Sequence, residues 1–233
     1  MKLSIIIPLF NEKETVIELI NRVKSAPLPE GMQREIIIVD DGSTDGGVSE
    51  KEKETFPDII FLKHERNRGK GAAIRTALQK VSGDIAIIQD ADLEYDPNEY
   101  SSLLKPIVSG NADVVYGSRF ITGSTRRIHL FRHYIGNRFL TFLSNLFSNY
   151  NLSDMETCYK VFKTNIIKKI KLRENRFGFE PEVTQKLARL KARMYEVGIS
   201  YHGRDFEEGK KIKPFKDGLW ALICIIRYGL GLG

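Results

Sequence analysis

The most constraining feature of the chain is an apolar run that stops abruptly at two acidic residues. Residues 84–89 are rich in apolar and β-branched side chains, and Asp90 and Asp92 follow at once. This pattern is typical of a buried strand whose carboxyl end delivers carboxylates to a crevice. Two carboxylates one residue apart suit a hard divalent cation, Mg²⁺ or Mn²⁺, that bridges to phosphate oxygens. The same acids could instead cap the following helix, so this cluster alone leaves both interpretations open.

Two further apolar runs end in the same way. Residues 35–39 lead into an acidic segment that begins at Asp40, and residues 3–7 lead into Asn11 and Glu12. Ligands of open α/β sheets bind outside the carboxyl ends of the strands. Three strand ends with polar or acidic residues therefore favour a ligand site at that edge over three unrelated turns.

The spacing of the apolar runs predicts an α/β fold with a mostly parallel sheet. Strand and helix patterns alternate as far as about residue 118, as they do in βαβ units. The expected strands are residues 3–7, 35–39, 59–62, 84–89 and 113–116, and helices are expected to begin near Glu12, Gly46, Lys70 and Pro97. A length of 233 residues, of which 42% are hydrophobic, suits one globular core, so we expect a single domain.

The pattern changes after Arg119, where a basic loop precedes a long helical segment. The loop carries Arg126, Arg127, His129 and Arg132. Apolar residues then recur at helical spacing, at Ile135, Phe139, Leu143, Leu146 and Tyr150. Packing on the core is the default explanation for such a stripe. A groove for a lipid chain is the alternative, because cationic residues crowd its amino-terminal end.

The longest apolar stretch, residues 219–226, is far shorter than the roughly 20 residues needed to cross a bilayer. It is preceded by Lys210, Lys211, Lys213 and Lys216. A short apolar helix beside lysines predicts either a helix that lies on an anionic membrane surface or one that packs on its own domain. We therefore expect a protein that does not cross the membrane.

Charge and cysteine content narrow the partners and the compartment. The net charge of +6 and the pI near 9.2 favour anionic partners, namely phosphates, nucleic acid or an acidic membrane surface. Nucleic acid is disfavoured because the aromatic residues are not interleaved with a basic patch. Cys158 and Cys224 have neither metal-ligand spacing nor a disulfide framework, which indicates a reducing, cytoplasmic setting. The start of the chain lacks a cleavage-site pattern, so no signal peptide is expected.

Several motifs, in order along the chain, resemble the inverting glycosyltransferases of family 2. The resemblance is to the branch that contains dolichol-phosphate mannosyltransferase and other polyprenyl-phosphate glycosyltransferases. The matching segments are residues 7–12, 39–45, 67–73, 89–97, 117–120, 154–160 and 208–211. The resemblance implies a GT-A fold, with a Rossmann-like sheet and a carboxyl-terminal helical acceptor region. Residues 1–118 would form the nucleotide-sugar half of one domain, and residues 119–233 the acceptor half with its membrane-surface helix.

The same resemblance implies a donor site for a UDP- or GDP-sugar. The nucleotide pocket would be built from Pro8, Asn11, Glu12, Asp40, Gly69, Lys70 and Gly71. Asp40 at a strand end can accept hydrogen bonds from a base or ribose, and glycines let a backbone approach a ligand. The acidic DXD motif, Asp90-Ala91-Asp92, would hold Mg²⁺ or Mn²⁺ against the diphosphate, with Glu94 as a third contact in place of the glutamine common in this branch. Arg204, Lys210 and Lys211 would close over the diphosphate.

The acceptor implied by the resemblance is a polyprenyl or dolichyl phosphate. A lipid monophosphate is already an anionic nucleophile, so it needs positioning by cations more than deprotonation. The expected catalytic residues are Asp92 through its metal, Arg119 and Arg132 on the acceptor phosphate, and Asp154 as the carboxylate near the acceptor. If the acceptor were a saccharide or protein hydroxyl, Asp154 would be a general base. A second alternative is a non-catalytic module that binds nucleotide sugars or a membrane surface. A peripheral position on the cytoplasmic face, alone or through a membrane-anchoring partner, completes these expectations.

Overall fold

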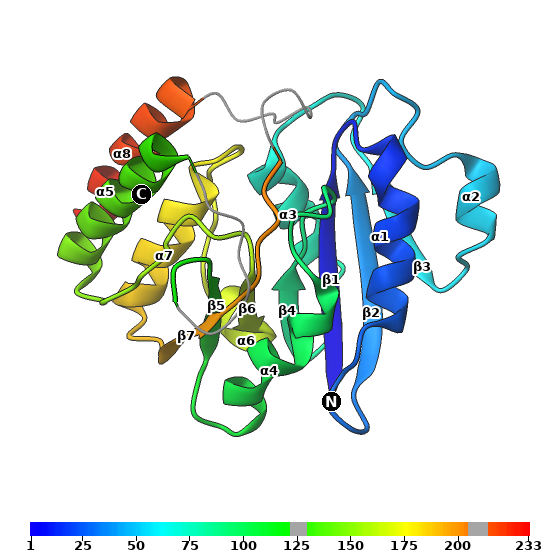
Figure 1. Ribbon diagram of the computed structural model, residues 1–233, viewed down its shortest axis with the longest axis horizontal. Helices are drawn as coiled ribbons and strands as arrows, with labels where there is room; N and C mark the ends of the chain where they lie inside the picture. Colours follow the sequence, from blue (N-terminus) through cyan, green and yellow to red (C-terminus); the bar gives the residue numbers. More distant parts are fainter. Residues whose placement is uncertain (122–129, 205–213) are drawn as a thin grey trace.

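The computed structural model describes residues 1–121, 130–204 and 214–233, with the side chains of the last segment described from Lys216. It has one seven-stranded sheet, in the order β3-β2-β1-β4-β6-β5-β7 (Figure 1). The strands are β1 (Lys2–Leu9), β2 (Gln33–Asp40), β3 (Ile59–Lys63), β4 (Ile85–Ile88), β5 (Val114–Ser118), β6 (Lys160–Lys163) and β7 (Met194–Gly198). Of the strands in the described residues, only β6 runs antiparallel to its neighbours, so the expected mostly parallel α/β sheet is confirmed.

Helices flank this sheet. They are α1 (Lys13–Ser25), α2 (Glu50–Glu54), α3 (Lys70–Leu78), the 3-10 turn η1 (Pro97–Glu99), α4 (Tyr100–Val108), α5 (Phe131–Ser148), α6 (Thr164–Ile167), α7 (Phe179–Arg189) and α8 (Pro214–Gly229). At one end of the molecule, α1 and α2 lie near β1, β2 and β3 (Figure 1). At the other end, α5, α7 and α8 pack on one another.

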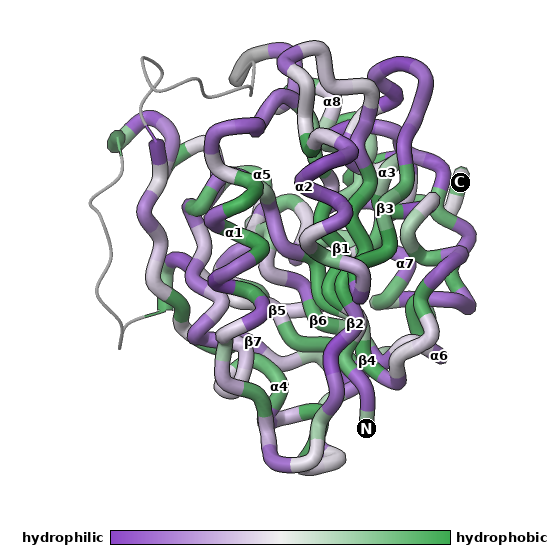
Figure 2. Tube along the Cα trace, turned by 90° about the vertical axis from the view of Figure 1, so that its right-hand side faces the viewer, coloured by the Kyte–Doolittle hydropathy of each residue, from purple (hydrophilic) through white to green (hydrophobic). Residues whose placement is uncertain are grey.

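The centre of the sheet is buried on both faces. The side chains of Ile5, Ile37 and Ile87, from three neighbouring strands, have no exposed surface. Figure 2 shows the most hydrophobic segments of the chain in these central strands. Strands covered by helices on both faces need continuous apolar runs, which is the pattern that the sequence shows. Full burial of each such side chain contributes about 1.5–3 kcal/mol.

Two strands and one helix start differ from the sequence expectation. The strand patterns missed β6 and β7, because four or five residues with lysine or glutamate among them show no clear period. The helix expected near Gly46 begins instead at Glu50. Gly46 and Gly47 have φ angles of +100° and +50°, which no helix allows. Ser49 and Glu52 then form a capping box that fixes the helix start.

The apolar stripe of the long helix does not pack on the core as expected. Ile135, Phe139 and Leu146 are 50%, 54% and 68% exposed, so the core interpretation is wrong for these three residues. Leu143 and Tyr150 are partly buried against the core, and Tyr150 lies just beyond the end of α5. The helix packs on α7 and α8, yet it leaves a row of large apolar side chains uncovered.

The carboxyl-terminal apolar stretch lies within α8 and is divided between two environments. Ala221, Cys224 and Ile225 are buried, so packing on its own domain is confirmed for one side of the helix. Trp220 and Ile223 remain exposed on another side. Among the described residues, none of the helices is long and apolar enough to span a bilayer.

Candidate functional site

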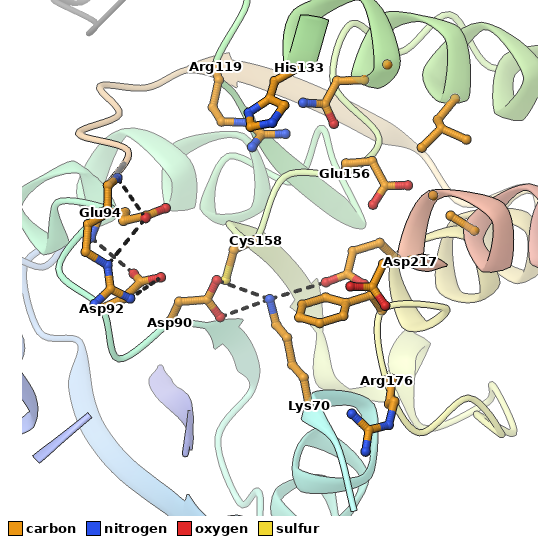
Figure 3. A pocket seen from close by; sticks show the side chains of 18 of the residues that line it. Lys70, Asp90, Asp92, Glu94, Arg119, His133, Glu156, Cys158, Arg176 and Asp217 are labelled. Carbon is orange, nitrogen blue, oxygen red and sulfur yellow. Dashed lines mark hydrogen bonds and ion pairs between the residues drawn. The ribbon is translucent and has the colours of Figure 1, made fainter. Parts of the chain in front are cut away.

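A cavity of about 1210 Å³ opens at the carboxyl ends of β1, β2 and β4. It extends toward α5 and α8, where Phe139, Leu140, Leu219 and Leu222 give it an apolar wall. Small-molecule pockets usually measure roughly 300–1,000 Å³, so this cavity has room for more than one ligand. Figure 3 shows charged side chains from several elements lying around it.

One end of the cavity is organised by Asp41, which follows β2 directly. Its carboxylate lies 2.6 Å from the Nδ1 atom of His64 and accepts the backbone N–H groups of Arg68 at 2.9 Å and Gly69 at 2.6 Å. Asp41, Gly69 and the neighbouring Lys70 all line the cavity. The buried carboxylate therefore ties the loop before α3 to the end of β2.

Asp40, expected in the nucleotide pocket, is oriented differently. Its carboxylate accepts the N–H of Ser43 at 2.8 Å and lies 3.5 Å from the Nζ atom of Lys63. Among the described residues it lines a small separate depression beside β3, and Asp41 lines the large cavity in its place. Successive strand residues point to opposite faces, so moving the assignment by one residue changes the side chain that reaches the cavity.

The glycines of the loop before α3 make room for protein backbone. Gly69 has a φ of +100°, and a Cβ atom there would lie 2.4 Å from the carbonyl oxygen of Asn175. A Cβ atom at Gly71 would lie 2.4 Å from the carbonyl oxygen of Glu174. The sequence-based explanation, close approach to a ligand, is therefore incomplete: both glycines first allow residues 174–175 to pack against the start of α3.

The end of β1 supplies Pro8 to the cavity, and the turn that follows supplies Glu12. Glu12 lies 2.8 Å from the guanidinium group of Arg204. Asn11 has a φ of +51°, and its side-chain carbonyl accepts the N–H of Thr44 at 2.8 Å. The role of Asn11 visible in the structure is thus to join the turn after β1 to the loop after β2.

The paired carboxylates reach the middle of the cavity from the end of β4. Asp90 lies 2.9 Å from the Nζ atom of Lys70, which also lies 3.2 Å from a carboxylate oxygen of Glu180 (Figure 3). Asp92 accepts the N–H of Glu94 at 3.1 Å. Ala91 lines the cavity between the two acids. Lys70 therefore neutralises charge beside Asp90 and leaves Asp92 with less compensation.

The charge around Asp92 is unbalanced. Burial, followed by the negative charges of Asp90 and Glu94, raises the pKa of Asp92 to about 8. Arg204 lies 3.6 Å from Asp92 and 3.6 Å from Glu94. Glu94 also accepts hydrogen bonds from the Tyr201 hydroxyl, at 2.5 Å, and from the backbone N–H of Arg204, at 2.9 Å.

The donor set at the end of β4 fits a divalent cation at Asp90 and Asp92. Both carboxylates line one cavity, and the burial and neighbouring negative charges that raise the pKa of Asp92 are both offset when a cation binds to its ionised form. Within the part of the chain that the structure describes, no group of three or more acidic, histidine or cysteine side chains is arranged to hold a metal. Glu94 is engaged by Tyr201 and Arg204, so a third contact would require these bonds to open.

Arg119, which directly follows β5, forms a bidentate ion pair with Asp154. Its Nε and one terminal nitrogen each lie 2.7 Å from Asp154, and its backbone N–H donates to the same carboxylate at 3.0 Å. Asp154 is fully buried, whereas Arg119 lines the cavity and lies 5.3 Å from the ring centre of Tyr201. Both oxygens of Asp154 are thus occupied in holding the guanidinium group.

The remaining expected residues divide between the cavity rim and the undescribed segments. Arg132 and His133, in the first turn of α5, line the cavity, and Figure 3 shows His133 beside Arg119. Arg126, Arg127, Lys210 and Lys211 lie outside the described residues. The structure therefore brings together Pro8, Glu12, Gly69, Lys70, Asp90, Ala91, Asp92, Glu94, Arg119, Arg132 and Arg204 around one cavity.

Sequence reasoning missed several residues that line this cavity or hold it together. Asp41 and Cys158 line the cavity and lie inside recognised motifs, but the functional roles were assigned to other residues of those motifs. His64, which directly follows β3, holds Asp41, and Glu156 lies two residues after Asp154. Glu180 had no strand-end signal at all, because it comes from the first turn of α7. Its relation to Lys70 follows only from the tertiary fold, which brings the first turns of α7 and α3 together.

Comparison with known proteins identifies relatives for most of the chain. The model of the family described as glycosyl transferase family 2 matches residues 4–171. Dodecaprenyl-phosphate galacturonate synthase of Rhizobium johnstonii is 27% identical over 208 residues, covering 88% of this chain and 60% of that protein. Dolichol-phosphate mannosyltransferase of Pyrococcus furiosus is 34% identical over 126 residues, covering 53% and 34%. Undecaprenyl-phosphate 4-deoxy-4-formamido-L-arabinose transferase of Salmonella paratyphi B is 30% identical over 212 residues, covering 90% and 62%.

Solved structures support the fold. Glucosyl-3-phosphoglycerate synthase of Mycobacterium tuberculosis, crystallised with Mn²⁺, UDP and glucosyl-3-phosphoglycerate, matches with a TM-score of 0.74. The sequence identity is 18%, and the match covers 97% of this chain and 79% of that one. The chain spans 34–62% of the length of the three curated relatives above.

Proposed function

Because this chain belongs to glycosyltransferase family 2, we propose that it transfers a sugar, with inversion, from a UDP- or GDP-sugar to a polyprenyl or dolichyl phosphate. The observation that carries the proposal is a single cavity whose lining combines acidic, basic and apolar side chains. Paired carboxylates, the arginines Arg119, Arg132 and Arg204, and an apolar wall from α5 and α8 all line this cavity. A nucleotide diphosphate with its metal, an anionic acceptor and a lipid chain require these three environments in this order.

On the donor side, the nucleotide would lie between the turn after β1 and the loop before α3. Pro8, Glu12 and Asp41 line this end of the cavity, and Asp41 fixes the loop that carries Lys70. Asp90 and Asp92 would hold Mg²⁺ or Mn²⁺, which, when bound, neutralises charge on the departing diphosphate. Arg204, held by Glu12, adds a second cation beside Asp92.

On the acceptor side, Arg119 and Arg132 would bind the lipid phosphate. A guanidinium group donates two parallel hydrogen bonds and suits phosphate oxygens. Asp154 serves as a positioning residue, because its buried carboxylate fixes the Arg119 side chain at the cavity wall. A phosphate acceptor needs no general base, which agrees with a carboxylate fully occupied by an arginine.

The lipid chain would leave the cavity between α5 and α8. Phe139 and Leu219 line the cavity and are also more than half exposed, so the apolar wall continues onto the outer surface. Exposed Phe131 and Phe142 on α5 and Trp220 on α8 extend this surface. We infer a peripheral position on an anionic membrane, on its cytoplasmic face, with the two helices against the lipid. A membrane-anchoring partner would strengthen the same contact.

The experiment that tests the proposal is a transfer assay with defined acceptors. The purified chain is incubated with Mn²⁺, radiolabelled UDP- or GDP-sugars, and either a short polyprenyl phosphate or the matching polyprenyl alcohol. Label is expected in the phosphate lipid and not in the alcohol. Transfer to oligosaccharide or protein hydroxyls, without transfer to the phosphate lipid, would instead establish the alternative in which the acceptor is a hydroxyl group.

A further inference from the structure

Two glutamates outside the expected site line the same cavity. Glu156 lies in the segment before β6, and Glu180 lies in the first turn of α7. Glu180 is only 3% exposed, and one of its oxygens lies 3.2 Å from the Nζ atom of Lys70. Its second oxygen, and one oxygen of Glu156, are buried without a hydrogen-bond partner among the described residues. Figure 3 shows the carboxylate of Glu156 near the space between α5 and Lys70.

These unpartnered oxygens are energetically unfavourable in the isolated protein. A buried polar group without its hydrogen bond destabilises a fold by about 1–3 kcal/mol, and by more when it is charged. Burial and the neighbouring charge of Glu180 raise the pKa of Glu156 to about 8, which shows how closely the two carboxyl groups interact. In native proteins such groups call for a specific explanation, such as a catalytic role or a bound water, ion or ligand.

The nearest buried lysine does not supply the missing donors. The Nζ atom of Lys160 donates to the backbone carbonyl groups of Met155 and Thr157 at 2.8 and 2.5 Å. It also lies 4.1 Å from the ring centre of Tyr116. Lys160 therefore anchors the loop that carries Glu156, and it leaves one carboxyl oxygen of each of the two cavity-lining glutamates without a donor among the described residues.

The position of the two glutamates identifies the ligand group that they face. In the sheet, β6 lies between β4 and β5, and because it is antiparallel its beginning lies at the edge where those two strands end. Asp90 follows β4 and Arg119 follows β5, so Glu156 lies between the diphosphate side and the acceptor side. Lys70 bridges Asp90 directly to Glu180. In a glycosyl transfer, the sugar occupies the space between the leaving diphosphate and the acceptor.

We propose that Glu156 and Glu180 bind hydroxyl groups of the transferred sugar and that they select an uncharged sugar over a uronic acid. This inference rests on the proposed function. Sugar hydroxyls donate hydrogen bonds to carboxyl oxygens, and neighbouring hydroxyls can satisfy both unpartnered atoms. The ionised carboxylate of a uronic acid replaces one hydroxyl donor with a group that only accepts hydrogen bonds, and it adds a negative charge beside Glu180 and Asp90. Lys70 is already shared between these two carboxylates, so it would offset little of that charge.

Matched ligands test the selection. Binding to the full chain with Mn²⁺ is measured by calorimetry for UDP, UDP-glucose, UDP-galactose and the two corresponding uronic acids, and in parallel for GDP, GDP-mannose and GDP-mannuronic acid. At least one uncharged sugar nucleotide is expected to bind about tenfold or more tightly than its uronic acid, a difference of about 1.4 kcal/mol. Glu156→Gln and Glu180→Gln should weaken that sugar nucleotide about tenfold and reduce the selection, while binding of the nucleoside diphosphate alone changes less than about twofold.

The controls separate this inference from the proposed function. Glu54→Gln, an exposed change on α2, should leave every affinity unchanged. If none of the uncharged sugar nucleotides binds more tightly than its uronic acid, the selection is overturned. Equal losses for the nucleoside diphosphate and the sugar nucleotide would show that the glutamates only support the fold of the site. If the wild-type chain binds no nucleotide at all, the proposed function and this inference both fail.

Discussion

At the scale of single residues, the two carboxylates after β4 carry the clearest consequence for activity. Asp92→Asn removes negative charge that would hold a metal against the diphosphate, so transfer should fall by a factor of about 100 or more. The variant should remain folded, because the pKa of Asp92 is raised to about 8 and its ionised form is disfavoured in the folded protein. Initial rates with Mn²⁺ and melting temperatures test both parts. Full activity of Asp92→Asn and Asp90→Asn in excess chelator would remove the metal from the mechanism.

The pairing of Arg119 with Asp154 predicts a selective loss of acceptor use. Arg119→Ala leaves Asp154 buried without its cation and removes the phosphate contact. The lower kcat/KM for the acceptor should correspond to a loss of about 2–5 kcal/mol in transition-state stabilisation. Asp154→Asn keeps the shape of the site but loosens Arg119, so it should give a smaller loss of the same kind. Donor affinity, measured separately with a nucleoside diphosphate, should be nearly unchanged for both. Comparable losses in donor binding would assign Arg119 to the donor side.

Glu156 predicts a distinct dependence of stability on pH. Its pKa is raised from 4.5 to about 8 in the folded protein, so the folded state binds this proton more tightly than the unfolded chain. Stability contributed by this group is therefore lost as the pH rises from about 4.5 to about 8. Glu156→Gln should flatten that decline and raise the melting temperature at pH 8 by about 2–4 °C for each kcal/mol gained. Thermal melts from pH 5 to 8.5 test this, and a slope identical to that of wild type would contradict it.

At the scale of elements, the strand ends were predictable and the helix-borne side chains were not. Apolar runs that stop at Glu12, Asp40 and Asp90 mark the edge of the sheet, because a buried parallel strand has a sequence pattern of its own. The sequence pattern could not tell which of Asp40 and Asp41 faces the cavity, because neighbouring residues of a strand point to opposite faces. Glu180 reaches the cavity because the start of α7 lies close to the start of α3, where Lys70 pairs with it, and no local pattern encodes such a tertiary contact.

The loop before α3 illustrates how an element constrains a site from outside. Gly69→Ala would place a Cβ atom 2.4 Å from the Asn175 carbonyl oxygen, at a φ of +100° that side chains avoid. The backbone strain alone should destabilise the fold by about 1–3 kcal/mol. The loop should also release the amide groups held by Asp41, which would weaken nucleotide binding. Urea unfolding and nucleotide titration measure the two effects, and Gly110→Ala, which meets no atom within 4 Å but shares a positive φ, separates clash from strain.

At the scale of the whole molecule, the sheet order arranges the proposed reaction along one line. The turn after β1 and the loop after β2 would hold the nucleotide, β4 the diphosphate, the start of β6 the sugar and the end of β5 the acceptor phosphate. The helices α5 and α8 lie at this end of the molecule (Figure 1), and they carry exposed apolar side chains. The lipid chain of the acceptor would extend toward them. A membrane at that end would present the acceptor without requiring the lipid to leave the bilayer.

This arrangement predicts reversible binding of the full chain to anionic vesicles. Phe142 and Leu146 on α5 are 64% and 68% exposed, so Phe142→Glu with Leu146→Glu should greatly reduce co-sedimentation without affecting the core. Lysines that face the membrane add about 1 kcal/mol each, so raising the salt concentration should release part of the bound protein. Val108→Glu, an equally drastic change at an exposed site on α4, should bind like wild type. If the wild-type chain stays in the supernatant at every salt concentration, the two helices do not bind lipid by themselves, and a partner protein must deliver the acceptor.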